Sequence, residues 1–191
     1  MKTKFKEGKI IEIFYVEKRG KKIPVIIRYP KKSDVNGIWK FYNKVIKETE
    51  FLSRITPVSL KDEKKWVANA IKSMKKGNSA YIIIESDGKI VGSSTVERKS
   101  EEVHKHVGGF GIAILQEYTG IGLGRRLMEL IEKEAKNMEL EIIQLSVYGK
   151  NKVAHGLYKK TGFIEAGKIP KLIKRKNSYD DDIIMYKALK K

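Results

Sequence analysis

Hydrophobic residues in the first part of the chain predict a β-hairpin followed by two amphipathic helices. The β-branched and aromatic residues of Lys9–Val16 and Val25–Ile27 flank Arg19-Gly20, a pattern typical of two strands joined by a turn. Pro24 cannot donate a ladder hydrogen bond, so the second strand is expected to begin at a sheet edge. Helical spacing follows Ser33-Asp34, at Val35, Ile38, Phe41, Tyr42, Val45 and Ile46. A second helix is predicted between Ser59 and Lys76-Gly77-Asn78, carrying Trp66, Ala70, Ile71 and Met74.

The remaining chain alternates between strand and helix patterns. Ser86-Asp87-Gly88 joins two β-branched runs and predicts a hairpin of Ala80–Glu85 with Lys89–Arg98. A long amphipathic helix is expected from about Gly122 to Met138, with Leu123, Leu127, Leu130, Ile131 and Ala135 on its inner stripe. The other expected elements are a strand at Gly109–Leu115, a strand at Glu141–Val147, a short helix at Asn151–Thr161, and strands at about Phe163–Leu172 and Asp182–Leu189.

This order of elements predicts a mixed α/β fold of the α+β type. A central, mostly antiparallel, twisted mixed sheet of about seven strands is expected, flanked by about four helices. A chain of 191 residues buries about 70% of its unfolded surface, which supports one sizeable core. We therefore expect a single domain over 1–191, with 1–29 as an N-terminal β-hairpin extension.

The composition adds a strong positive charge and excludes several chemistries. With 41 Lys+Arg against 23 Asp+Glu, the formal net charge is +18, which favours anionic partners such as a phosphorylated cofactor or nucleic acid. Dispersed lysines also form an ordinary solvated surface. The absence of cysteine excludes disulfides, thiolate zinc sites and cysteine nucleophiles. No apolar run reaches the roughly 18 residues of a membrane helix, and Met1–Lys6 lacks the centre of a secretion signal, so a cytoplasmic protein without a membrane partner is expected.

The three histidines offer little for metal binding. His104 and His106 would share one face if they lay on a strand, which is the arrangement a metal pair needs. Exposed or hydrogen-bonded side chains are the simpler interpretation, and we expect no metal in this protein.

A glycine-rich loop carries the sharpest local signal for chemistry. Thr119-Gly120-Ile121-Gly122-Leu123-Gly124-Arg125-Arg126 lies between a strand and the start of the long helix. The first amides of a helix have no internal partner, and the helix dipole adds positive potential, so this arrangement favours an anion such as a phosphate. A P-loop would end in Gly-Lys-Ser/Thr, and a dinucleotide fingerprint would place its third glycine one residue later. Glycines that merely permit a tight turn remain the alternative.

A second motif makes the glycine loop more specific. The stretch from Leu115 through Thr119-Gly120-Ile121-Gly122-Leu123-Gly124-Arg125-Arg126-Leu127 is followed, about 25 residues on, by Asn151-x-x-Ala154-x-x-Leu157-Tyr158-x-x-x-Gly162-Phe163. The two motifs, in this order and spacing, resemble the acetyl-CoA-binding core of the GNAT superfamily of N-acetyltransferases. The resemblance covers roughly Ala80 to Leu189. It implies transfer of an acetyl group from acetyl-CoA to a primary amine of a protein N-terminus, lysine, polyamine or small molecule.

The resemblance also implies roles for individual residues. The strand segment Ile112-Ala113-Ile114 would pair with the amides of the pantetheine arm. Main-chain amides of Gly120, Ile121, Gly122, Leu123, Gly124 and Arg125 would hold the diphosphate. Asn151 would hold the cofactor or an ordered water, and Tyr158 would stand near the thioester sulfur as general acid, because a phenol of pKa about 10 can protonate a thiolate whose thiol has a pKa of about 8.5. Tyr158 packed only as a core aromatic is the structural alternative.

The chain departs from the family pattern at two positions. Thr119 stands where Arg or Gln most often begins the glycine loop, so one phosphate contact would be missing or supplied by Arg125 or Arg126. Ser146 stands where some relatives carry a glutamate base. Glu97 is our first candidate for the base, ahead of His106 or a water chain, although a solvated carboxylate is the simpler interpretation of Glu97.

The C-terminal part leaves the acceptor open. The acidic residues Asp180-Asp181-Asp182 would attract a cationic amine or form an exposed cluster, and the basic run 168–176 would hold the 3′-phosphate of the cofactor or an acidic protein. The competing hypothesis is a nucleic-acid or chromatin-associated binding module that has lost catalysis. Dispersed lysines and the lack of a groove-reading or RNA-stacking motif make nucleic acid the less favoured partner. The N-terminal hairpin would add an edge strand, cover the acceptor site or form a homodimer contact.

Overall fold

The computed structural model describes residues 5–189, and the expected hairpin extension and single domain begin outside that range, at residues 1–4. Within it one sheet has the strand order β1-β2-β3-β4-β5-β6-β8-β7. Its eight strands are β1 (Ile10–Lys18), β2 (Lys21–Arg28), β3 (Ser79–Ser86), β4 (Lys89–Arg98), β5 (Val107–Ile114), β6 (Ile142–Tyr148), β7 (Ile164–Lys174) and β8 (Tyr179–Ala188). The four α-helices are α1 (Val35–Glu48), α2 (Leu60–Lys75), α3 (Leu123–Asn137) and α4 (Lys152–Lys160). The mixed fold class is confirmed, with one strand more than expected.

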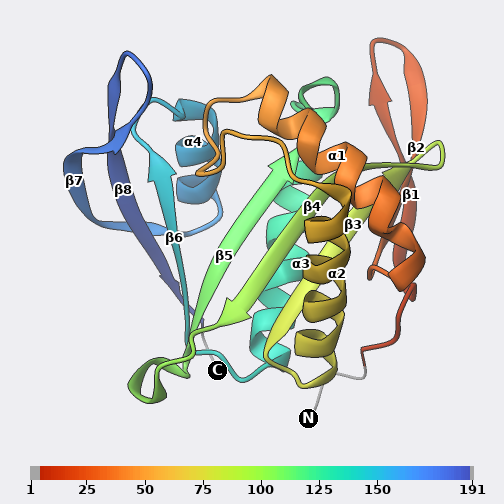
Figure 1. Ribbon diagram of the computed structural model, residues 1–191, viewed down its shortest axis with the longest axis horizontal. Coiled ribbons are helices and arrows are strands. Elements are labelled where there is room, and N and C mark those ends of the chain that lie inside the picture. Colours follow the sequence, from red (N-terminus) through yellow and green to blue (C-terminus); the bar gives the residue numbers. More distant parts are fainter. Residues whose placement is uncertain (1–4, 190–191) are drawn as a thin grey trace.

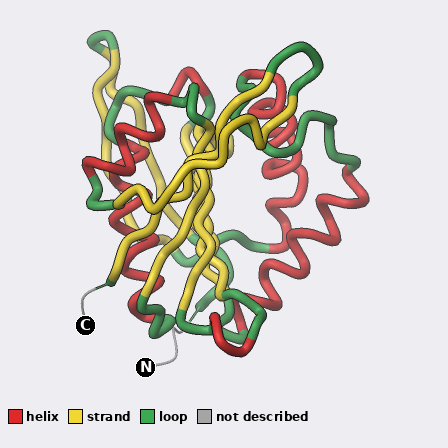
Figure 2. Tube along the Cα trace, turned by 90° about the vertical axis from the view of Figure 1, so that its left-hand side faces the viewer, coloured by secondary structure: helices red, strands yellow, loops and turns green. Residues whose placement is uncertain are grey.

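Helices cover both faces of the sheet (Figures 1 and 2). In Figure 1, α1 and α2 lie in front of the central strands and α3 lies behind them. Because both faces are covered, consecutive residues of β3 are buried, from Ala80 to Ile84, instead of alternating with exposed ones. The three isoleucines Ile82, Ile83 and Ile84 have no exposed surface and form the centre of the core.

The sheet divides between β5 and β6, and we call this division the fork. All neighbouring strands are antiparallel except β5 and β6, which pair in parallel over only three positions, Val107–Gly109 with Ile142–Gln144. Beyond that point β5 continues on β4, and β6 continues on β8. Figure 1 shows the two strands separating toward their C-terminal ends. One backbone edge of β5 from Phe110 to Ile114 therefore has no strand partner within residues 5–189.

The predicted helix starts are correct in position but differ in mechanism. Ser59 caps α2 through its side chain, which accepts a hydrogen bond from the Asp62 amide at 3.1 Å. Asp34 precedes α1 but makes no side-chain cap of that helix. Its carboxylate is buried and pairs with Arg28 of β2, because the buried guanidinium is a stronger partner than a helix amide.

The N-terminal hairpin joins the sheet with both of its strands. β1 forms the edge, and β2 pairs with β3 over Ile26–Arg28 only. Pro24 pairs with Tyr15 of β1 and lies outside the segment that contacts β3, so its missing N–H removes no hydrogen bond on that side. The expectation that this arm begins at an edge is therefore confirmed.

Candidate functional site

The unpaired edge of β5 is the first part of the candidate site. Ile112, Ala113 and Ile114 pair on one side with Ser94, Ser93 and Gly92 of β4. Their other side faces the fork, where backbone donors and acceptors are available to an added strand. An extended ligand with amide groups, such as a pantetheine arm, fits this edge.

The glycine loop at the start of α3 is the second part. Gly120 and Gly122 have φ angles of +77° and +85°, a conformation that favours glycine. Gly122 caps α3 without a side chain. No backbone amide from Gly120 to Arg125 donates a hydrogen bond to any residue within 5–189, which leaves an array of donors at a helix N-terminus. The donor set fits a diphosphate.

Gly124 holds the loop against α4. A Cβ atom at Gly124 would lie 3.1 Å from the Leu157 side chain, so a larger residue would force Leu157 of α4 to shift by a few tenths of an ångström. This contact places the loop, and the amides of Ile121 and Leu123, next to the helix that carries Tyr158. The third glycine of the motif thus lies at a close contact between α3 and α4.

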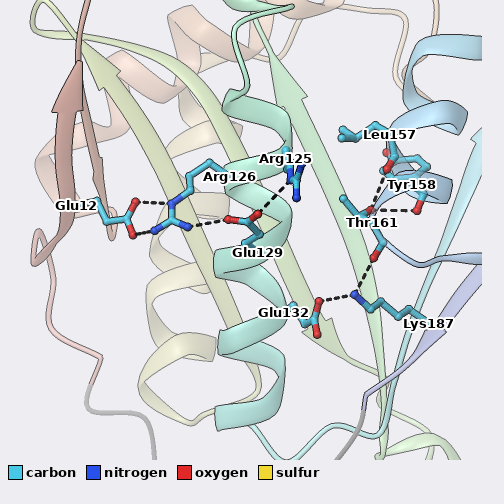
Figure 3. Close-up of polar contacts among 9 residues, drawn as sticks. All are labelled: Glu12, Arg125, Arg126, Glu129, Glu132, Leu157, Tyr158, Thr161 and Lys187. Carbon is cyan, nitrogen blue, oxygen red and sulfur yellow. Dashed lines mark hydrogen bonds and ion pairs between the residues drawn. The ribbon is translucent and has the colours of Figure 1, made fainter. Parts of the chain in front are cut away.

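The two arginines after the loop have different environments (Figure 3). Arg126 forms ion pairs with Glu12 of β1 and, at 2.7 Å, with Glu129. These carboxylates raise the pKa of the Arg126 guanidinium, chiefly because they accept its hydrogen bonds, Glu12 first and then Glu129. Arg125 has 76% of its side chain exposed and only a 3.3 Å contact with Glu129. The sequence left either Arg125 or Arg126 to contact the phosphate. Arg125, which is more exposed and less engaged, is the better candidate.

Tyr158 lies on α4 beside the fork. Its ring packs edge-on against Phe110, with centroids 6.0 Å apart, and against Phe163 at 5.9 Å. Phe110 is the first residue of β5 beyond the last pair with β6. The Tyr158 hydroxyl makes no hydrogen bond to another residue in the described part of the chain. Burial raises the Tyr158 pKa to about 12, so the phenol keeps its proton over the physiological range.

Asn151 begins α4 and already has one structural task. Its side-chain oxygen accepts a hydrogen bond from the Ala154 amide at 3.1 Å, which caps the helix. The Asn151 side-chain NH₂ group is left as the donor for a ligand or water. The role of Asn151 in holding the cofactor therefore remains a prediction, and the NH₂ group would make that contact.

The candidate bases lie at different places around the fork. Glu97 of β4 is exposed and pairs with Gly109, so it sits where β5 and β6 are still joined. His106 is exposed just before β5. Ser146 donates a hydrogen bond to Asp182 of β8 at 3.0 Å, so a carboxylate from another strand lies beside the position where some relatives carry glutamate. The sequence placed Asp182 in the acidic run Asp180-Asp181-Asp182 but did not pair it with Ser146, which lies 36 residues away.

The C-terminal charges are mostly engaged within the protein. Asp181 accepts a hydrogen bond from the Lys171 amide and pairs with Lys168 at 3.2 Å. Arg175 binds the backbone oxygens of Glu50 and Leu52 between α1 and α2, and its guanidinium lies 5.4 Å from the ring centre of Tyr148. Arg175 thus joins the β7–β8 hairpin to the α1–α2 connection.

A cavity between α1 and α2, which we call the α1–α2 pocket, was not anticipated from the sequence. It has a volume of about 500 Å³ and lies between α1, α2 and the face of β3, β4 and β5. Gly111, Ile112 and Ala113 line it, so the pocket adjoins the unpaired edge of β5. Trp66 of α2 is 44% exposed and lines this pocket.

Metal and membrane features are absent from the described residues. No group of three or more His, Asp or Glu side chains is placed to hold a metal ion within 5–189. His104 ends a short 3₁₀ turn (Glu102–His104) and His106 follows it, so the two do not share a strand face. No helix in this range is long and apolar enough to cross a membrane.

Comparison with known proteins agrees with this geometry. The model of the Acetyltransferase (GNAT) family matches residues 45–163. The chain is 32% identical over 100 residues to the L-amino acid N-acetyltransferase AaaT of Escherichia coli, covering 52% of this chain and 62% of that protein. It is 30% identical over 145 residues to the beta-lysine N(6)-acetyltransferase of Methanococcus maripaludis, covering 74% of this chain and 46% of that protein.

A solved structure shares the fold. The GNAT superfamily phosphinothricin acetyltransferase of Sinorhizobium meliloti, solved in complex with acetyl-CoA, superimposes with a TM-score of 0.76 at 15% identity. The match covers 86% of this chain and 88% of that chain. On the family match, this chain belongs to the Acetyltransferase (GNAT) family and is an acetyl-CoA-dependent N-acetyltransferase.

Proposed function

We propose that this protein transfers the acetyl group of acetyl-CoA directly to the primary amine of a small molecule, with Tyr158 as general acid. The observation that carries the proposal is the meeting of three features at the fork: the unpaired β5 edge, the unpaired loop amides and the Tyr158 ring. Acetyl-CoA supplies the activated acetyl thioester. The protein orients it, excludes water and supplies a proton to the leaving sulfur.

The proton and electron balance assigns a task to each group. A base takes one proton from the acceptor ammonium, and the nitrogen lone pair then forms a bond to the thioester carbonyl carbon as the carbon–sulfur bond breaks. The electron pair of that bond goes to sulfur, which receives the Tyr158 proton. The amide nitrogen loses its second proton to solvent, and Tyr158 regains one, so each turnover releases one proton to solvent.

The protein groups that would hold acetyl-CoA follow from the same features. Ile112, Ala113 and Ile114 would pair with the pantetheine amides, and the amides of residues 120–125 would hold the diphosphate. Asn151 would contribute its NH₂ group. Glu97 remains a prediction for the base.

Small amines are favoured as acceptors by the relatives. The Escherichia coli and Methanococcus maripaludis proteins are named for acetylation of L-amino acids and of beta-lysine. An acceptor panel of amino acids, polyamines and peptides, read by release of free thiol from acetyl-CoA, tests the assignment. We expect at least one small amine to react well above background hydrolysis, and a reaction confined to peptides or absent throughout would contradict the proposal.

Replacing Arg125 with alanine is expected to raise the dissociation constant of coenzyme A about fivefold, because one exposed charge-assisted contact to the diphosphate is lost. Arg126→Ala is the matched control and should change the constant by about twofold or less, because Arg126 is engaged by Glu12 and Glu129. Isothermal titration calorimetry at two salt concentrations measures both. Equal losses in the two variants would show that Arg125 has no special role.

A further inference from the structure

The α1–α2 pocket joins a polar wall to an aromatic wall. Aromatic side chains come from α1, α2 and β3, namely Tyr42, Trp66 and Tyr81. Hydroxyl groups come from Ser93 and Thr95 of β4. Because Gly111–Ala113 also line the pocket, a molecule inside it would lie next to the strand edge on which the acetyl-bearing arm is proposed to bind.

Glu63 is the unusual group in this pocket. Only 4% of the residue is exposed, yet its carboxylate makes no hydrogen bond and no ion pair with any residue in the described part of the chain. Its oxygens are not among the buried polar atoms of residues 5–189 that lack a partner, because they open onto the pocket. A carboxylate in such a partly desolvated position is stabilised by a cation bound in the pocket. Burial raises the Glu63 pKa, and the nearby positive charge of Arg54 opposes that shift. The carboxylate is therefore ready to receive a positive charge or a proton.

Arg54 supplies the opposite charge on the same pocket. It lies in the connection between α1 and α2, lines the pocket, is exposed, and forms no ion pair within residues 5–189. The connection itself is held in place, because Trp39 donates a 2.7 Å hydrogen bond to the Val58 carbonyl and Asn43 accepts one from the Val58 amide at 2.7 Å. Arg54 is thus a free cation on an anchored segment.

We propose that the α1–α2 pocket binds the acceptor as a free amino acid, with Glu63 receiving the ammonium group and its proton and Arg54 receiving the carboxylate. This inference rests on the proposed function, since it identifies the acceptor class and the base. Glu63 lies inside the pocket and Arg54 lies at its exposed side. This arrangement fits an amino acid whose ammonium group enters first and whose carboxylate stays near Arg54. A peptide N-terminus or a polyamine lacks the nearby carboxylate that Arg54 would bind, and the aromatic wall suits an apolar side chain.

The other carboxylates near the fork are less suited to this task. Asp62 also lines the pocket, but its carboxylate accepts a 2.7 Å hydrogen bond from Ser59 at the start of α2. Asp182 accepts one from Ser146, and Glu97 is exposed to solvent. In the described part of the chain, Glu63 alone combines burial, an empty hydrogen-bonding capacity and access to the pocket.

Binding without turnover provides the first test. Titration of L-leucine, L-methionine and L-phenylalanine into the protein saturated with coenzyme A should change the fluorescence of Trp66, which Trp66→Phe would identify as the source. The primary amides of the same amino acids keep the amine and lose only the carboxylate charge, and they should bind at least about tenfold more weakly. Equal binding of acids and amides, or no binding of any of the three acids, would overturn the proposal.

Two variants separate the two charges. Arg54→Met should weaken amino-acid binding about tenfold and leave the amides unchanged, so the preference disappears. Glu63→Gln should weaken binding of acids and amides alike and lower kcat/KM about 100-fold, while coenzyme A affinity stays constant. Lys64→Gln, an exposed neighbour on α2 that does not line the pocket, is the matched control and should change nothing.

The outcomes distinguish this inference from the proposed function. Saturable binding of an amino acid that depends on Glu63 and Arg54, without acetyl transfer to it, would refute the proposed function and retain the pocket. Transfer that persists in Glu63→Gln but is lost in Glu97→Gln would refute Glu63 as base. Should Glu63→Gln fail to fold, Arg54→Met still tests the proposal with the amino acids and their amides. If Arg54→Met keeps the preference for the acids over the amides, the zwitterion pocket is refuted.

Discussion

Tyr158→Phe is expected to lower kcat about 100-fold while leaving the affinity for acetyl-CoA nearly unchanged. The substitution removes the Tyr158 hydroxyl proton and keeps the ring that packs on Phe110 and Phe163. Because burial raises the Tyr158 pKa to about 12, the phenol remains protonated as the pH rises past the ordinary tyrosine value near 10. Tyr158 should therefore cause no loss of kcat between about pH 8 and 10.

Steady-state kinetics by thiol release, with calorimetry for coenzyme A, measures both effects of Tyr158→Phe. Tyr179→Phe is the matched control, because Tyr179 lies on β8 with 51% of its surface exposed, and it should retain full activity. If kcat of Tyr158→Phe stays close to that of the unmodified protein, the ring serves packing only and the general acid is another group.

Arg28→Leu is expected to lower the free energy of unfolding by about 3–5 kcal/mol. The Arg28 guanidinium donates to both oxygens of Asp34, at 2.7 and 2.9 Å, and to Glu85 at 2.9 Å. Arg28 and Asp34 are each only 8% exposed. Removing the guanidinium leaves the Asp34 carboxylate buried with little more than the Lys31 amide as a partner, which costs more than the lost attraction alone.

Urea denaturation followed by circular dichroism measures this loss. Lys75→Met, which removes the exposed ion pair with Glu7, is the control and should cost less than about 1 kcal/mol. The double variant Arg28→Leu/Asp34→Leu should recover part of the stability, because no unpaired charge remains. A single-variant loss no larger than that of the control would mean that the Asp34 carboxylate reaches water or changes its protonation at little cost.

The local elements of this protein are readable from sequence because they depend on neighbouring residues. The periodicity of Val35 to Ile46 places α1, and Ser86-Asp87-Gly88 places the turn between β3 and β4. The glycine loop is also local, since the positive φ of Gly120 and Gly122 and the free amides arise within a few residues. The family resemblance then follows from two such local motifs and their spacing.

Contacts between distant residues required the tertiary structure. Glu12 and Arg126 are 114 positions apart, so no local pattern shows that one arginine of the loop is engaged and the other is accessible. By its sequence position Glu63 is an ordinary acid in the first turn of a helix, where the dipole favours it. Only the packing of α2 on the sheet places it, largely buried, on the wall of the α1–α2 pocket.

The sequence by itself determined the order of strands and helices, the glycine loop and the family resemblance, because these depend on short-range backbone preferences and local motifs. The tertiary structure alone decided where β5 and β6 separate and which charges remain unpaired beside that opening. The reason is physical: burial and pairing of a charge depend on which segments pack around it, and packing brings together residues that the chain keeps far apart.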